Sequence, residues 1–527
     1  MDGRAGGLSL VDWTVVALFL GAVLVLGLRV AGRQHTTRDY FLGGRSLPWW
    51  AVALSIIATE TSAATYIGTP GMAYRSSWHF LQMVLGFLLA RIFVARFFLM
   101  AFYRSEALTV YGFLRDRFGE PARITAALLF LAGRVIGSGV RLYAACMALR
   151  VAAGWQDDRA TLWAIAGLGL LALAYTLLGG IKAVVWTECI LGTTFLVGGI
   201  AAVAVLLGKI PGGLSAVASL PEFADKVRVL HLAPPSGMGL LESTQPLWIG
   251  LGGGFVLSLA THGTDQDMVQ RMLACPDSRR GGLSLIASAA LNVPLNMIFL
   301  SVGSLLYFYH RLVPAAQPQG ITNADEYFLL FIAREIPMGL AGLVLAGLFA
   351  AAVSSHTSVL NALASTCVAD FYRPHIRKGA PEAHYLLASR IFTAAWGAIL
   401  IAVAAAFIGS RKNILEIALG ALTYFYGSLL GIFLLGLFTR MGNARSAVVG
   451  MVVAVPVVLL LQARDFLERL DQAPTAVQAI LGGLPPGLQD LLRQVPLLAW
   501  PLWIVVGTAI SFAIGALGRA DRAGGPA

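Results

Sequence analysis

One membrane-length apolar segment of this chain is interrupted by polar and helix-breaking residues. The stretch from Ser55 to Gly71 carries Glu60 and a cluster of hydroxyl side chains, together with the helix breakers Gly68 and Pro70. Lipid offers no hydrogen-bond partners for backbone N–H and C=O groups. A spanning helix therefore opens a turn only where protein or a water-filled cavity provides such partners. An ionisable side chain at membrane depth is costly, and its default interpretation is a functional site. The segment therefore predicts an opened helix beside a buried polar site.

A second apolar run is interrupted in the same way at residues 260–271, Ala-Thr-His-Gly-Thr-Asp-Gln-Asp-Met-Val-Gln-Arg. Two interrupted helices at corresponding places in two halves of one membrane protein are typical of secondary transporters. The two segments together therefore indicate transport rather than a structural or enzymatic role.

Composition excludes an ordinary soluble protein. The chain has 527 residues, of which 57% are hydrophobic and 12% charged, and its mean hydropathy is +0.76. We expect an all-α integral membrane protein with about thirteen spans, and no room for a sizeable soluble domain. The predicted spans are residues 10–31, 47–72, 78–103, 124–153, 160–178, 183–208, 245–272, 283–309, 338–372, 386–409, 414–438, 444–462 and 496–517.

The net charge of +11 indicates membrane topology rather than nucleic-acid binding, because the basic residues cluster in alternate loops. By the positive-inside rule these loops are cytoplasmic, so we expect the N-terminus outside the cell and the C-terminus in the cytoplasm. The expected membrane is a bacterial inner membrane. The first span lacks a small-residue cleavage site and is expected to be retained. The basic loops contain Arg33, Arg38 and Arg45; Arg104, Arg115, Arg117 and Arg123; Arg271, Arg279 and Arg280; Arg373, Arg377 and Lys378; and Arg440 and Arg445.

The two interrupted spans divide the chain into two units of five spans with peripheral helices at both ends. Because five is odd, the second unit enters the membrane in the opposite orientation, which is an inverted repeat. We expect a peripheral helix with a cytoplasmic loop at 1–46 and a first repeat at 47–209. An extracellular loop at 210–243 leads to a second repeat at 244–440. Two peripheral helices with an extracellular loop follow at 441–527.

The span 338–372 carries an unusual density of hydroxyl groups. Ala351, Ser354, Ser355, Ser358 and Asn361 share one face through i+3 and i+4 spacing. Alkali cations prefer oxygen ligands, which hydroxyls and freed carbonyls provide. The alternative is that these serines only bond across to a neighbouring helix.

With this hydroxyl-rich segment and several other motifs, the chain resembles the sodium:solute symporter family. That family includes sodium/glucose, sodium/proline and sodium/sialic acid transporters. The resemblance runs from about residue 10 to about residue 450. It implies the five-plus-five inverted-repeat fold named after the bacterial leucine transporter. The motifs that carry it are Ala-Ala-Val-Ser354-Ser355-x-x-Ser-Val-Leu-Asn361, Asp39-Tyr-Phe-Leu-Gly-Gly-Arg45, Tyr175-Thr-x-x-Gly-Gly-Ile-Lys-Ala-Val-x-Trp-Thr-Glu188, Thr264-Asp-Gln-x-x-Val-Gln-Arg271 and Phe433-Leu-Leu-Gly-Leu-Phe438.

The resemblance implies two sodium sites. The first would use the carbonyls of Ala58, Thr61 and Ala351 and the hydroxyls of Ser354 and Ser355. The second, present in some members, would use Glu188, Ser354, Thr357 and Ser358. Glu188 is one methylene longer than the usual aspartate, and its alternative role is to pair with a gate-lining lysine or arginine.

Two arginines, Arg134 and Arg141, lie two helical turns apart at membrane depth. A guanidinium group can bind a carboxylate through two parallel hydrogen bonds. Glu60 is expected to order the sodium pocket or to meet a cationic group of the substrate. The alternative for all three is charge balance inside the protein. Sugar-transporting members of the family place aromatic residues just before the Thr-Asp-Gln motif to stack on the sugar ring, whereas this chain has Thr261-His262. This difference argues against a glucose-type sugar as the substrate. The full expected substrate set is Glu60, Thr65, Gln82, Arg134, Arg141, Thr261, His262 and Thr264.

We therefore expect a sodium-coupled symporter that imports a small polar solute, anionic or zwitterionic, by alternating access. Sodium is the co-transported ion, and no organic cofactor, nucleic acid or obligate protein partner is expected beyond the bilayer. A proton-coupled symporter using Glu60 or Glu188 is the main alternative. A transporter-like sensor is disfavoured because no signalling module follows Leu517, and an enzyme is disfavoured because no Ser/His/Asp set or metal-ligand cluster occurs at matched depth.

Overall fold

The computed structural model describes residues 8–30, 34–61, 63–105, 108–155, 157–319, 321, 323–408, 414–468, 478 and 481–519, and every regular element in these ranges is helical. The α-helices are α1 (Leu10–Val30), α2 (Thr37–Leu42), α3 (Trp49–Glu60), α4 (Ala63–Arg75), α5 (Phe80–Arg104), α6 (Gly112–Phe118), α7 (Glu120–Ala153), α8 (Asp158–Lys209), α9 (Gly213–Ala218), α10 (Phe223–Lys226), α11 (Leu247–Gly263), α12 (Gln266–Leu273), α13 (Ser278–Leu312), α14 (Asp325–Arg334), α15 (Leu340–Thr366), α16 (Glu382–Ala406), α17 (Ile414–Phe438), α18 (Ala444–Glu468), α20 (Pro486–Arg493) and α21 (Trp500–Ala516). Short 3₁₀ turns lie at Gly43–Arg45 and Pro314–Ala316, and a π-helical segment, η3, continues α15 over Cys367–Ile376.

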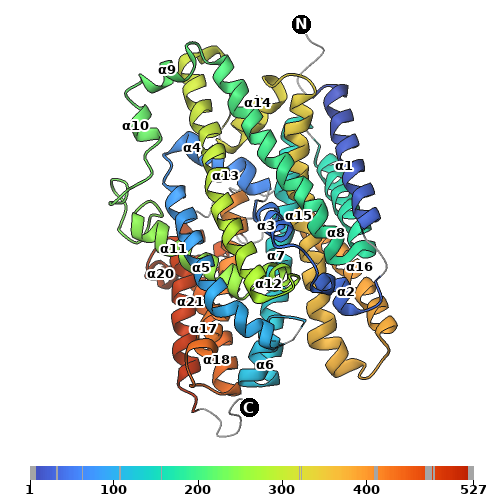
Figure 1. The fold of residues 1–527 in the computed structure, drawn as a ribbon. Helices are drawn as coiled ribbons and strands as arrows, with labels where there is room; N and C mark the ends of the chain where they lie inside the picture. Colours follow the sequence, from blue (N-terminus) through green and yellow to red (C-terminus); the bar gives the residue numbers. More distant parts are fainter. Residues whose placement is uncertain are drawn as a thin grey trace.

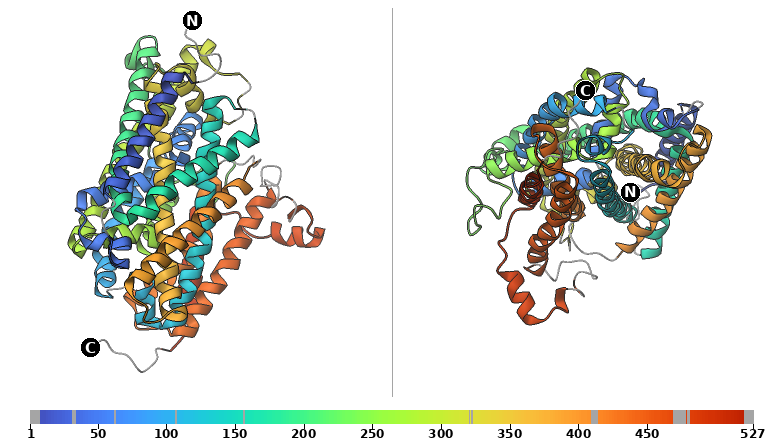
Figure 2. Two further views of the ribbon diagram at one scale, coloured as in Figure 1. Left: turned by 90° about the vertical axis from the view of Figure 1, so that its right-hand side faces the viewer. Right: turned by 90° about the horizontal axis from the view of Figure 1, so that it is seen from below.

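The long helices run side by side along one direction and form a single bundle, from which α20 projects at one side (Figures 1 and 2). In the described part of the chain, eight helices are long and apolar enough to cross a membrane. Shorter apolar helices at Arg159–Ala174, Leu247–Gly263, Thr423–Phe438 and Trp500–Ala516 lie within other predicted spans. An all-helical membrane protein is thereby confirmed.

Both predicted interruptions occur. The first separates α3 from α4, where Thr61 has a non-helical backbone (φ −78, ψ 80). The second separates α11 from α12, where Asp265 is extended and its side chain caps α12 by accepting from Asp267 N. Each break leaves backbone carbonyls and amides at a helix end without an intrahelical partner. Both breaks therefore place free backbone polar groups inside the bundle.

The expectation that Gly68 and Pro70 break the first span is wrong. Helix α4 runs continuously through both residues. Pro70 instead serves close packing against α13, since a Cβ on Gly303 would lie 2.1 Å from the Pro70 carbonyl oxygen. The opened turn lies about two turns earlier, at the end of α3.

A single glycine divides the longest helix, α8. Gly180 has φ 55 and ψ −157, a conformation that only glycine adopts readily. A Cβ at this position would also lie 2.4 Å from the carbonyl oxygen of Tyr40. The kink falls between the two spans that the sequence predicts at 160–178 and 183–208.

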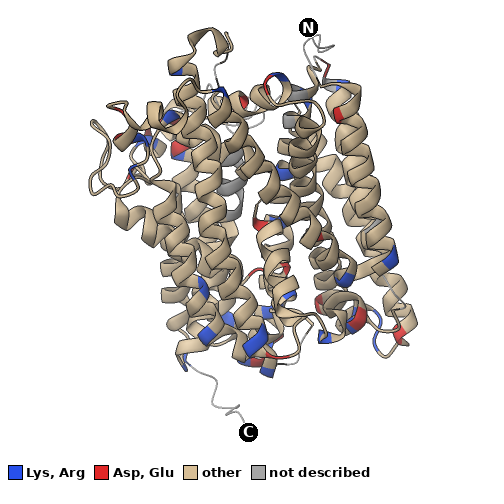
Figure 3. Ribbon diagram, turned by 45° about the horizontal axis from the view of Figure 1, so that its top comes forward, with Lys and Arg blue, Asp and Glu red and all other residues tan. Residues whose placement is uncertain are grey.

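Helix α15 is the centre of the bundle. In its most apolar stretch 94% of the residues are buried, and it packs against α1, α3, α7, α8, α12 and α16. Its hydroxyl-rich face is therefore directed at protein rather than lipid. Charged residues lie mainly toward the end of the bundle near the C-terminus, with others in loops at the opposite end and a few in the middle (Figure 3).

The loop between α8 and α11 is tied to the end of α4. The Lys226 ammonium donates to the carbonyl oxygens of Tyr74 at 2.6 Å and Ser76 at 3.2 Å and lies 3.9 Å from the ring centre of Tyr307. Partial burial lowers the pKa of Lys226 to about 8. These contacts hold the far end of the broken helix to the loop.

Candidate functional site

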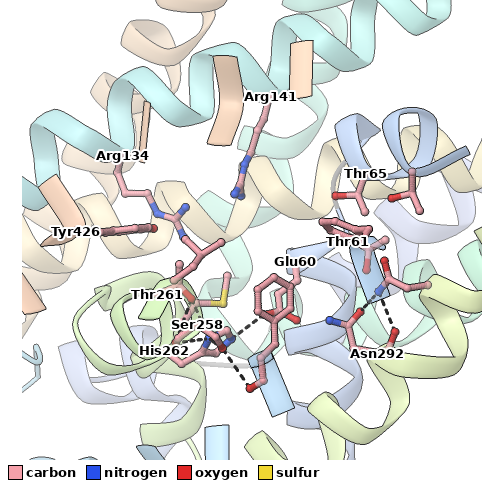
Figure 4. A pocket seen from close by; sticks show the side chains of 16 residues that line it. Glu60, Thr61, Thr65, Arg134, Arg141, Ser258, Thr261, His262, Asn292 and Tyr426 are labelled. Atoms are coloured by element: carbon pink, nitrogen blue, oxygen red, sulfur yellow. Dashed lines mark hydrogen bonds and ion pairs between the residues drawn. The ribbon is translucent and has the colours of Figure 1, made fainter. Parts of the chain in front are cut away.

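A cavity of about 110 Å³ opens at the first helix break and is bounded by α3, α4, α5, α7, α11, α12, α13 and α17. A single water molecule needs about 10–15 Å³ on this measure, so the cavity has room for more than one water or a bare ion. Of the eight predicted substrate residues, six line it (Figure 4): Glu60, Thr65, Arg134, Arg141, Thr261 and His262.

The other two predicted substrate residues serve local structure. The Gln82 side-chain amide donates to the carbonyl oxygen of Gln245 at 2.8 Å. This bond joins the start of α5 to the loop that precedes α11. The Thr264 hydroxyl donates to the carbonyl oxygen of Ala260 at 2.8 Å and is fully buried. Neither residue lines the cavity.

Glu60 is charge-compensated within the bundle. Its carboxylate forms an ion pair with Arg91, and the same oxygen lies 2.7 Å from His262 Nε2. Arg91 is completely buried and also donates to the Ser288 hydroxyl at 2.9 Å. The carboxylate is therefore held at the cavity wall by two partners before any solute arrives.

Arg134 is likewise paired inside the protein. Its Nε lies 3.2 Å from Asp265 Oδ2, and its Nη2 pairs with Asp267. The Tyr426 hydroxyl donates to Asp265. Arg134 therefore joins α7 to the second helix break, with α17 as a third partner.

Arg141 behaves differently, although it lies on the same side of α7. It forms no ion pair with a described residue, and its buried Nη1 has no hydrogen-bond partner among them. Figure 4 shows its guanidinium pointing into the space between the α3–α4 break and α11. The cavity thus presents one half-buried guanidinium group that forms no ion pair with a described carboxylate.

Next to the cavity, Glu188 connects three helices. Its carboxylate accepts from the hydroxyls of Ser55, of Thr59 at 3.0 Å and of Ser354 at 2.9 Å. Arg271 Nη2 lies 3.0 Å from Glu188, and Arg271 Nη1 lies 2.7 Å from Asp267. All of these charged groups are at most 1% exposed. Arg271 thereby links the Glu188 cluster to the Asp267–Arg134 pair.

The residues of the expected first sodium site lie on two helices that are in contact, α3 and α15. The Ser355 hydroxyl donates to the Thr59 carbonyl oxygen at 3.3 Å, directly before the break. Ala58, Thr61, Ala351 and Ser354 are buried. The end of α3 thus supplies carbonyls opposite the hydroxyls of α15.

In the expected second site, Glu188 and Ser354 are in direct contact, while the other two hydroxyls bond elsewhere. Thr357 donates to the Ser354 carbonyl oxygen at 3.0 Å. Ser358 lies 3.3 Å from Asp267 Oδ2 and 3.2 Å from the Ser355 carbonyl oxygen. Both hydroxyls act as donors in these bonds, so their oxygen lone pairs remain available to a cation, but neither hydroxyl is hydrogen-bonded to Glu188.

Sequence reasoning missed several residues of this region. The interior Arg91 was detectable as an arginine within an apolar run. Asn292 and Asn296, one turn apart on α13 and joined by a 2.8 Å hydrogen bond, line the cavity and were detectable by their spacing. The roles of Tyr426 and Asp267 could not be predicted from neighbouring residues, because the side chains that they contact lie far away in the sequence.

Known proteins are similar to this chain over most of its length. The family model described as the sodium:solute symporter family matches residues 40–454. This chain belongs to the sodium:solute symporter family. It is 31% identical over 454 residues to a sodium/sialic acid symporter of Proteus mirabilis, covering 85% of this chain and 89% of that one. It is 30% identical over 461 residues to a sodium/sialic acid symporter of Aliivibrio fischeri, covering 86% and 88%.

A solved structure confirms the overall likeness. The substrate-bound, outward-open structure of a sodium-coupled sialic acid symporter matches with a TM-score of 0.81 and 26% identity over 97% of both chains. The symporter described here is therefore a membrane-spanning, sodium-coupled solute transporter, and sodium is its co-transported ion. The proton-coupled alternative finds no support in these comparisons.

Proposed function

We propose that the family member described here imports an organic carboxylate together with sodium. The observation that carries this proposal is the Arg141 guanidinium, which points into the cavity without an ion-pair partner among the described residues. A guanidinium fork matches a carboxylate bidentately. Relatives of this chain are named for sialic acid and for monocarboxylates, which supports the same charge.

A carboxylate fits better than a zwitterion. A cationic amine would need a free carboxylate, whereas Glu60 already has Arg91 and His262 as partners. The opposite wall offers the amides of Asn292 and Asn296 and the hydroxyl of Thr65. We infer that the solute carries its negative charge toward Arg141 and hydroxyl or amide groups toward α13.

Charge balance supplies a physical reason for coupling. Among the described residues of this region, four arginines face four carboxylates: Arg91, Arg134, Arg141 and Arg271, and Glu60, Glu188, Asp265 and Asp267. A carboxylate entering alone would leave one net negative charge in a poorly solvated interior, which is costly. One sodium between α3 and α15 restores neutrality, so each ligand favours binding of the other.

For the sodium sites, we propose the first as Ala58, Thr61, Ala351, Ser354 and Ser355, and the second as Glu188, Ser354, Thr357 and Ser358. A membrane potential of about 100 mV contributes about 2.3 kcal/mol per net elementary charge that enters. The carboxylate cancels the charge of one sodium ion, so two sodium ions per solute give about fifty-fold accumulation from the potential. The hydroxyls of α15 and the opened end of α3 form the contact through which ion binding and helix position are linked.

The proposed architecture has thirteen spans in the leucine-transporter-type five-plus-five inverted repeat. The two breaks, α3–α4 and α11–α12, then occupy the first helix of each repeat, as the expected boundaries require. The proposed membrane is a bacterial inner membrane with the N-terminus outside and the C-terminus in the cytoplasm, since the basic loops alternate along the chain.

A thermal-stability screen of the purified protein tests the substrate proposal. Sialic acid, short monocarboxylates, neutral sugars and amino acids are compared in sodium and in choline buffer, since a ligand that binds only the folded state raises the melting temperature. We expect a carboxylate to stabilise the protein, and to do so more strongly in sodium. Stabilisation by neutral sugars alone would contradict the proposal.

Replacing Arg141 by lysine is expected to weaken binding of the stabilising carboxylate by about tenfold or more, because an ammonium lacks the planar fork. The melting temperature without ligand should change little, since Arg141 has no internal ion pair. Arg159→Lys, at an exposed position on α8, is the matched control. Equal affinity of Arg141→Lys and wild type in a binding titration would assign Arg141 another role.

If both proposed sodium sites operate, uptake should depend on sodium concentration with a Hill coefficient clearly above one. Glu188→Gln keeps the size of the side chain and removes the charge that would hold the second ion. We expect its Hill coefficient to fall toward one while uptake remains sodium-dependent. A wild-type coefficient of one, with transport that carries no net charge as one sodium per carboxylate requires, would rule out the second site.

A further inference from the structure

A row of polar side chains continues along α15 beyond the proposed sodium sites. Ser354, Ser358, Asn361 and Ser365 recur at i+4, i+3 and i+4, so they occupy one face of the helix. All four are buried. The row leads away from the cavity toward η3, which carries Arg373, and the loop after it, which carries Arg377 and Lys378.

Helix α12 lies against this face and supplies partners at two levels. Ser358 Oγ donates to Asp267 Oδ2 at 3.3 Å. One level further along, Ser365 Oγ donates to Gln270 Oε1 at 3.4 Å and accepts from Gln266 Nε2 at 3.4 Å. The polar face of α15 is therefore bonded to α12 both before and after Asn361.

Asn361 itself is the exception. It is 0% exposed, and neither its Oδ1 nor its Nδ2 has a hydrogen-bond partner in the described part of the protein. A buried amide without partners is rare, and its usual explanation is water or an ion at the site. A bare ion would satisfy only the oxygen, whereas water or a hydrated cation satisfies the oxygen and the NH₂ group together.

We propose that Asn361 is a relay site for hydrated sodium: it holds water between transport cycles and solvates the cation on its way out of the Ser354–Ser355 region along α15. This inference rests on the sodium sites put forward under the proposed function. It assigns the ion an exit that is separate from the cavity for the solute.

Electrostatics favours this separate exit. A cation leaving through the cavity would pass the guanidinium group of Arg141, which has no ion-pair partner among the described residues and repels the cation. The row on α15 offers neutral oxygens instead, and the Asp267 carboxylate beside Ser358 is already paired with Arg134 and Arg271. Beyond Ser365 lies Asp370, which is 1% exposed, accepts from the Thr109 hydroxyl at 2.9 Å and lies 3.8 Å from Arg123 Nε. Its second carboxylate oxygen has no hydrogen-bond partner among the described residues, so a further oxygen that a hydrated cation could contact lies past the amide.

Chemical labelling tests this inference without any solute. Asn361→Cys is exposed to a cationic methanethiosulfonate reagent in inside-out membrane vesicles, and modification is measured by mass spectrometry against the wild-type background. Leu363→Cys, equally buried but on the opposite face of α15, is the control. We expect Asn361→Cys to react at least about tenfold faster, since reaction requires contact with water, and sodium to slow it. Equal rates for the two variants would overturn the proposal.

A size-matched apolar variant provides a second readout. If Asn361 were merely a dry, unsatisfied amide, Asn361→Leu would be neutral or stabilising and would transport normally. We expect instead that net sodium-driven uptake falls by about tenfold or more, while solute exchange at equal sodium on both sides is retained, because exchange does not require sodium release. Wild-type net uptake would overturn the relay. Absence of any transported carboxylate would refute the proposed substrate class and leave the labelling result standing.

Discussion

Replacing Ser354 and Ser355 together by alanine is expected to raise the sodium concentration for half-maximal uptake by about tenfold or more. The proposed first site loses two of its five oxygen ligands. The change also removes the hydrogen bonds from these hydroxyls to Glu188 and to the Thr59 carbonyl, each worth about 1 kcal/mol or more. The measurement is uptake of the identified carboxylate as a function of sodium at fixed pH.

The control for this experiment is Ser389→Ala on α16. That serine is also buried, and its hydroxyl bonds to the Tyr385 carbonyl oxygen of its own helix at 2.7 Å. Its removal should leave the sodium dependence unchanged. An unchanged sodium requirement in the Ser354/Ser355 double variant would show that α15 does not coordinate the transported ion.

Replacing Arg271 by methionine is expected to destabilise the protein severely. Methionine keeps the length and apolar character of the side chain but leaves Glu188 and Asp267 without a counter-charge. Removing one partner of a fully buried ion pair costs about 3–5 kcal/mol. A large fall in the melting temperature of the purified protein, or loss of folded protein, is the expected result.

Two further variants show whether charge is the cause. Adding Glu188→Gln to Arg271→Met removes one of the two uncompensated carboxylates and should restore part of the melting temperature. Arg280→Met, at an exposed position on α13, should have little effect. A wild-type melting temperature in Arg271→Met would mean that the buried network contributes nothing to stability.

The two broken helices were predictable from sequence because polar residues within an apolar span have few alternatives to a buried site. The position of the first break was not. Proline and glycine at 68–71 suggest a break there, yet α13 approaches closely enough at Gly303 to pack on the intact turn. The interruption falls instead after Glu60, where α15 supplies Ser355 as a partner for a freed carbonyl.

The roles of the two arginines of α7 could not be separated from sequence. Arg134 and Arg141 have the same residue type and the same helical face, and only the positions of α12 and α17 distinguish them. Asp267 and Asp265 reach Arg134 across more than a hundred residues of sequence. The pairing of Glu60 with Arg91, and of Glu188 with Arg271, depends in the same way on helix packing that no local pattern encodes.

Uptake of the stabilising carboxylate into liposomes that contain the purified protein tests the central claim most directly. An inward sodium gradient is compared with an equal choline gradient at the same pH on both sides. We expect accumulation above equilibrium with sodium and none with choline. An inside-negative potential should increase the accumulation further, because two sodium ions entering with each carboxylate carry one net positive charge. Equal accumulation in the two salts would contradict sodium-coupled carboxylate import.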